Sequence, residues 1–128
     1  MEDGPKGLSS VTLFDTTQIG LERALTGASL RQATLTGNVA NANTPGYRRQ
    51  DVDFHAALRG AMGEGRDAVE RVAFSAAPDA SAVFRADGNG VDIDTEAANL
   101  ARNGLEYEGL VTVARSRMDI LRSAMGVG

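Results

Sequence analysis

The chain has 128 residues, of which 42% are hydrophobic and 5% aromatic, and its formal charge is −4. This length provides one small domain, and the scarcity of aromatic side chains indicates an interior that a partner completes. The basic residues are scattered apart from Arg48 and Arg49, so the sequence shows no basic patch that would bind nucleic acid. The chain contains no cysteine, which excludes disulfides and thiolate metal sites.

The N-terminal segment predicts neither a membrane anchor nor a leader peptide. No run in the sequence approaches the roughly 18 apolar residues that span a bilayer. The first residues lack a basic start followed by an apolar block, so we expect no cleaved export signal. Glycine, proline and serine instead favour a flexible lead-in over residues 1–11.

An apolar stripe with seven-residue spacing follows and predicts a long helix over residues 12–43. Thr12 is a suitable N-cap, and the helix must end before Pro45 because the residue preceding proline avoids the α region. Gln18 and Gln32 interrupt the stripe, which favours a role for them in partner choice. The positions expected to carry assembly on this helix are Phe14, Leu21, Leu25, Leu35 and Val39.

The sequence predicts a turn and a loop-rich middle region over residues 44–91. Pro45 fixes φ at the second turn position and Gly46 accepts a positive φ at the third, as a type II turn requires. Residues 48–58 fit either an extended segment or a short helix. The glycines of residues 60–67 favour a flexible linker, and alternating residues at 69–74 and 82–86 predict a small β-hairpin.

A second seven-residue series predicts a C-terminal helix over residues 92–126. Asp92 and Asp94 can cap its start. The expected fold is therefore mainly α: long N- and C-terminal helices pair as an elongated, coiled-coil-like hairpin, with a short β-hairpin in the middle region. The positions expected to carry assembly on the second helix are Leu100, Tyr107, Leu110, Val111, Met118 and Leu121.

The two stripes have two compatible uses. The same positions suit an intramolecular helical hairpin that needs no partner. Small residues beside the stripes widen the close-packing surface of each helix, which favours a larger bundle. We therefore expect the helices to serve assembly as well as folding.

His55 is the only histidine and follows two aspartates, Asp51 and Asp53, so a general base with an orienting carboxylate is one alternative. A small hydrolase would also need a positioned nucleophile and an oxyanion site, and the sequence contains no nucleophile elbow of the GxSxG type. The sequence therefore favours a protein without enzymatic activity, cofactor or metal.

The segment Gly37-Asn-Val-Ala-Asn-Ala-Asn-Thr-Pro-Gly-Tyr47 resembles the N-terminal signature of the flagellar axial family, which comprises rod, hook and hook-associated proteins. Three further segments are similar to the proximal-rod branch of that family: Leu13-Phe-Asp15, residues 47–54 and residues 87–94, followed by an ending over residues 105–125. The resemblance implies that the turn motif consists of Asn38, Asn41, Asn43, Thr44, Pro45, Gly46 and Tyr47.

The resemblance also implies a function. It implies a structural subunit of the proximal rod of the flagellar basal body, exported uncleaved by the flagellar type III apparatus and polymerised in the periplasm. Its implied partners are copies of itself, other rod proteins, the rod-to-ring adaptor, the membrane ring and the export gate. We expect a hollow shaft that transmits torque and conducts exported proteins. A cytoplasmic coiled-coil adaptor or export chaperone is the alternative, because it also fits an acidic chain with two helices.

Overall fold

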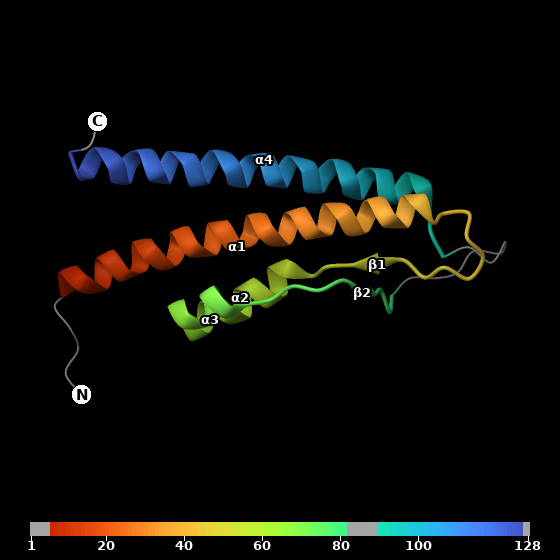
Figure 1. Ribbon diagram of the computed structural model, residues 1–128, viewed down its shortest axis with the longest axis horizontal. Helices are drawn as coiled ribbons and strands as arrows, with labels where there is room; N and C mark the ends of the chain where they lie inside the picture. The colour runs from red at the N-terminus through yellow and green to blue at the C-terminus, as the bar shows by residue number, and fades with distance from the viewer. Residues whose placement is uncertain (1–5, 82–89, 127–128) are drawn as a thin grey trace.

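The computed structural model describes residues 6–81 and 90–126, with side chains from residue 16 onward. Its elements in chain order are α1 (Lys6–Ala40), β1 (Gln50–Asp51), α2 (Phe54–Glu64), α3 (Arg66–Arg71), β2 (Ala77–Pro78) and α4 (Ile93–Ala124). The long helices α1 and α4 run side by side in opposite directions, and the middle elements lie along the other side of α1 (Figure 1). The expected mainly α fold with paired terminal helices is confirmed.

Helix α1 is longer at its start and shorter at its end than predicted. Residues 6–11 were expected to be a flexible lead-in, yet they are helical. Glycine and serine have a low helix propensity in the interior of a helix. Here they occupy the first turns of α1. At the other end, the Asn41 N–H donates to the carbonyls of both Gly37 and Asn38, and the Ala42 N–H donates to Val39. This tightening to three-residue bonds ends the helix at Ala40 instead of residue 43.

Two short helices lie in the middle region, where the sequence left a short helix open only for residues 48–58. Gly60 lies inside α2 together with Gly63, so the expected flexible linker over residues 60–67 was wrong. Burial of Phe54 and Ala61 stabilises α2 and outweighs the helix cost of the two glycines. The break between α2 and α3 falls at Gly65, whose φ of 110° suits glycine.

The short antiparallel strand pair of the middle region is present, but other residues form it. Gln50 lies opposite Pro78, and Asp51 lies opposite Ala77. The strands expected at 69–74 and 82–86 are not the pair that forms, because residues 69–71 belong to α3. Residues 82–86 lie outside the described residues. Because β2 pairs with β1, the segment that follows α2 and α3 lies beside the segment that precedes them.

Helix α4 begins where the sequence predicts its cap. The Asp92 carboxylate accepts hydrogen bonds from the backbone N–H groups of Asp94 at 3.0 Å and Thr95 at 3.3 Å. These bonds satisfy two of the donors that a helix start leaves free. At a rise of about 1.5 Å per residue, α4 is roughly 48 Å long. None of the described helices combines the length and the apolar composition that crossing a membrane requires.

The small hydrophobic core lies where α1 meets α2. It consists of Ala24 and Ala28 from α1 with Val52 and Phe54 from the following segment. Leu110 of α4 also packs against this cluster. One cluster therefore joins α1, α2 and α4.

Candidate assembly interface

Asn38 fixes the chain that follows the turn motif. Its side chain is completely buried, its amide nitrogen donates to the Gln50 carbonyl at 2.8 Å, and its oxygen accepts from the Gln50 N–H at 2.9 Å. The Tyr47 hydroxyl donates to the same oxygen at 3.2 Å. The Asn38 amide thus pairs with the backbone of Gln50 as a neighbouring strand would, and it holds β1 against the end of α1.

Other motif residues shape the turn. The Asn41 side chain donates to the Gly37 carbonyl at 2.9 Å, which satisfies one of the last acceptors of α1. Gly46 has a φ of 76°, and the Tyr47 N–H donates to the Thr44 carbonyl at 3.1 Å. Both features are those of the type II turn that the sequence predicts. The remaining surface of the motif is exposed at Asn43, Thr44, Pro45 and Gly46.

Arg49 connects the first strand to α4. Its Nε donates at 2.5 Å to Glu96, whose side chain is only 1% exposed, and its Nη2 donates at 3.1 Å to Asp51. A further ion pair joins Arg49 to Asp79. Burial lowers the pKa of Arg49, but the hydrogen bonds to Glu96 and Asp51 outweigh burial and hold the pKa above its ordinary value. The charge of the buried Glu96 carboxylate is therefore balanced by Arg49, which also pairs with two other acidic groups.

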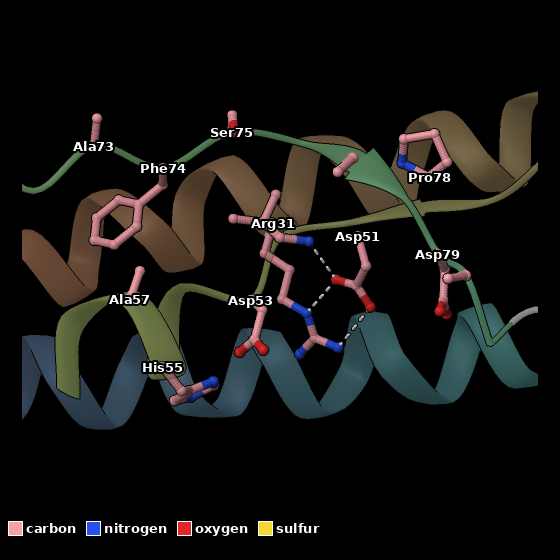
Figure 2. A pocket seen from close by; sticks show the side chains of 13 residues that line it. Arg31, Asp51, Asp53, His55, Ala57, Ala73, Phe74, Ser75, Pro78 and Asp79 are labelled. Atoms are coloured by element: carbon pink, nitrogen blue, oxygen red, sulfur yellow. Dashed lines mark hydrogen bonds and ion pairs between the residues drawn. The ribbon is translucent and has the colours of Figure 1, made fainter. Parts of the chain in front are cut away.

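Arg31 extends these contacts to α1. Arg31 donates two hydrogen bonds to Asp51, from Nε to Oδ1 at 2.8 Å and from Nη2 to Oδ2 at 3.2 Å (Figure 2). Burial raises the pKa of Asp51, but the hydrogen bond from Arg31 and the other contacts outweigh it and lower the pKa below its ordinary value. We call the connected side chains the junction network, which consists of Arg31, Asn38, Arg49, Asp51, Asp79 and Glu96.

The predicted stripes meet along the seam between α1 and α4. Leu35 is completely buried, whereas Tyr107 is 40% and Met118 44% exposed. The side chain of Phe14 lies outside the described residues. The half-buried positions are Leu21, Leu25, Val39, Leu100, Leu110, Val111 and Leu121. One subunit therefore uses most of both stripes for its own hairpin and leaves part of the α4 stripe uncovered.

Asn103 is a seam residue that the sequence did not single out. Its side chain is 1% exposed and donates at 2.8 Å both to the Ala28 carbonyl and to the Gln32 side chain. Gln32, interpreted from the sequence as a determinant of partner choice, is thus engaged inside the subunit. The available signal was the position of Asn103, three residues after Leu100 and four before Tyr107 on the same helix face.

Gly27 and Phe54 form a second contact that was missed. A Cβ built at Gly27 would lie 2.6 Å from Phe54, so only glycine allows the Phe54 ring to approach α1 this closely. Phe54 is 1% exposed. The signal in the sequence was a glycine inside the predicted helix, between Ala24 and Ala28, where neither a turn nor the end of the helix requires glycine.

His55 lines a cavity of about 590 Å³ beside α2 (Figure 2). Its Nε2 lies 2.7 Å from the Glu106 carboxylate, and its side chain is 47% exposed. Asp53 caps α2 by accepting from the Ala56 N–H at 3.3 Å. Ser75, the hydroxyl residue of the described lining, points away from His55 in Figure 2. Among the described lining residues, the site therefore brings no hydroxyl group to His55.

Comparisons with known proteins show the family of the chain. A family model described as "Flagella basal body rod protein" matches residues 21–48, which include the C-terminal half of α1 and the turn motif. The chain is 33% identical over 125 residues to the flagellar basal body rod protein FlgB of Yersinia enterocolitica, with 84% of this chain and 91% of the relative covered. The FlgB of Escherichia coli K12 is 34% identical over 124 residues, with 80% and 90% covered. The FlgB of Bacillus subtilis 168 is 29% identical over 130 residues, with 92% and 99% covered. The chain therefore belongs to the FlgB family of flagellar basal body rod proteins.

Proposed function

We propose that this chain, a structural subunit of the flagellar basal body rod by family membership, polymerises through its terminal helices into the hollow shaft of the proximal rod. In this shaft the hairpins of α1 and α4 stand side by side and form the wall. The shaft transmits torque and leaves a central passage for exported proteins. Chemistry plays no part in this role, and the chain works as a building block without a cofactor.

The observation that carries the proposal is the set of large apolar side chains that α4 leaves uncovered. Leu105 is 69% exposed, Ile120 61% and Met118 44%, although the helix belongs to a paired hairpin. Burying such side chains against a neighbour contributes about 1.5–3 kcal/mol for each complete burial. A subunit whose second long helix exposes this much apolar surface gains stability from assembly.

The partners follow from the place in the basal body. We propose contacts with copies of this chain, with the other rod proteins, with the rod-to-ring adaptor, and with the membrane ring and its export gate. We propose that the rod lies in the periplasm and that the chain reaches it through the flagellar export apparatus. The family match over residues 21–48 supports the rod location, and the whole turn motif lies within it.

Fractionation tests this function against the chaperone alternative, which the comparisons do not favour. The wild-type chain should copurify with intact basal bodies after the membrane is extracted with detergent. A chaperone would instead remain in the soluble fraction with its client. Recovery of the chain only in the soluble fraction of swimming cells would contradict the proposal.

A further inference from the structure

A groove of about 340 Å³ opens at the seam beside Gly104. Three of its lining residues belong to α1 and three to α4: Ala28, Ser29 and Gln32, and Gly104, Tyr107 and Glu108. A Cβ built at Gly104 would meet no heavy atom within 4 Å. Glycine inside a helix costs about 1 kcal/mol relative to alanine. The hairpin therefore carries a destabilising residue at a position where its own packing would accept a larger one.

The opposite side of the same helix carries an apolar ridge. Val113 is 47% and Ile120 61% exposed, and they lie one heptad apart. At about 100° per residue, these two positions lie roughly 180° and 160° around α4 from Gly104. Ser116, on the same side, carries no charge. Arg117 lies about 40° around the helix from Val113, at the edge of the ridge, and is half-buried in the subunit itself.

We infer that the Gly104 groove receives the Val113 and Ile120 ridge of a second copy of this chain. The inference rests on the proposed assembly function and names the contact within it. A branched apolar side chain fits between Ala28, Ser29 and Gly104, the small residues of the lining. The crest of the ridge, Val113 and Ile120, brings no charge of its own into the groove. The second copy is the occupant because a rod protein assembles and because this chain itself presents both halves of the contact.

The placement of the two surfaces determines the kind of assembly. Since groove and ridge lie on opposite sides of α4, a subunit that fills its neighbour's groove keeps its own groove open. Contacts of this heterologous kind continue from copy to copy and form a helical array when the rotation does not close. A two-fold dimer would instead bury the same surface of both copies.

Disulfide trapping tests the contact, because the natural chain has no cysteine. Two full-length chains are coexpressed in cells that lack the wild-type chain: one carries Gly104→Cys, the other either Val113→Cys or Ile120→Cys. After oxidation of isolated basal bodies, we expect a disulfide-linked dimer in at least one of the two combinations. Each cysteine chain expressed alone is the matched control and should remain monomeric on a non-reducing gel.

A pair of glycine substitutions provides an independent test that does not depend on trapping. Gly104→Ala and Gly104→Leu should both raise the unfolding temperature of the purified chain, because both favour the helix and the space beside Gly104 is open. Only the leucine fills the groove. We expect cells with Gly104→Leu to lose swimming and the chain to leave the basal-body fraction, whereas Gly104→Ala keeps both.

The possible outcomes separate the contact from the function. If both cysteine chains are present in basal bodies and neither combination crosslinks, or if Gly104→Leu supports normal swimming, the inference is overturned and the proposed function stands. A dimer formed by Gly104→Cys alone would also overturn it, because that contact is two-fold. Absence of the wild-type chain from basal bodies would remove the proposed function itself.

Discussion

The side-chain amide of Asn38 brackets the backbone of Gln50, donating to its carbonyl at 2.8 Å and accepting from its N–H at 2.9 Å. The two residues are twelve positions apart, and the rest of the turn motif lies between them. The end of α1 and the first strand are thus joined by a side chain that replaces a missing strand partner. Removing this side chain should therefore loosen β1 from α1.

Asn38→Ala should destabilise the purified chain by about 2 kcal/mol, because it leaves the half-buried backbone N–H and carbonyl of Gln50 without the Asn38 amide as partner. The free energy of unfolding, measured by urea titration with circular dichroism, checks this value. Asn43→Ala, an exposed asparagine of the same motif, is the matched control and should change stability by less than about 0.5 kcal/mol. Equal effects of the two substitutions would contradict the bracketing role.

Gly27→Ala should lower the unfolding temperature, because its Cβ would overlap Phe54 at 2.6 Å. Gly37→Ala, in the same helix, meets no atom within 4 Å and should stabilise the chain by up to about 1 kcal/mol. Phe54→Leu should recover part of the loss when combined with Gly27→Ala. Thermal melts of these chains and the wild type measure the effects, and a stabilising Gly27→Ala would be the adverse result.

The junction network makes stability depend on pH on the acidic side. Asp51, held by Arg31 against the effect of burial, and Asp79, held chiefly by Ser81, both have a pKa lowered from 3.8. Since the folded pKa lies below the unfolded one, their contribution is complete above the unfolded pKa and is lost as pH falls through the folded pKa. We expect the free energy of unfolding to decline below about pH 4.

Asp51→Asn should make this decline shallower while lowering stability at neutral pH, because the amide cannot carry the charge that pairs with Arg31. Asp67→Asn, at an exposed position of α3, is the control and should keep the wild-type slope. Urea titrations at a series of acidic pH values measure both slopes. The network would have no part in the pH response if Asp51→Asn and the wild-type chain lost stability in parallel.

Met118→Asp should separate assembly from folding. Met118 is 44% exposed, so the substitution should change the unfolding temperature of the free chain little. It should abolish swimming and copurification with basal bodies if neighbours cover this side chain. Met118→Leu keeps the apolar surface and should behave as wild type. Leu35→Asp is a poor test of assembly, because Leu35 is completely buried and its loss would unfold the hairpin itself.

The long helices could be predicted from the sequence because their seven-residue spacing is a local signal. The end of α1 before Pro45 and the cap at Asp92 are local as well, and the cap forms as predicted. The first half of α2 was left open between an extended segment and a short helix, and its second half was missed because Gly60 and Gly63 argue against a helix when taken alone. Its stability comes from burial of Phe54, which depends on a contact with α1.

The candidate site divides in the same way. The turn geometry at Gly46 follows from residues next to each other in the chain. The Arg49 contact to Glu96 joins residues 47 positions apart, and no periodic pattern indicates it. The stripes predicted an apolar seam, yet a period does not distinguish a face used inside the subunit from one used between subunits. That distinction needed the exposure of Met118 and Ile120 in the folded hairpin.

The pairing of α1 with α4 also has a consequence for the time course of folding. The Asn103 bond to Ala28 joins residues 75 positions apart, and the seam around it is built from similarly distant partners. Contacts of this range require closure of a long loop before they give any stability, which slows folding relative to local helix formation. We therefore expect the two long helices to begin forming before the seam between them closes.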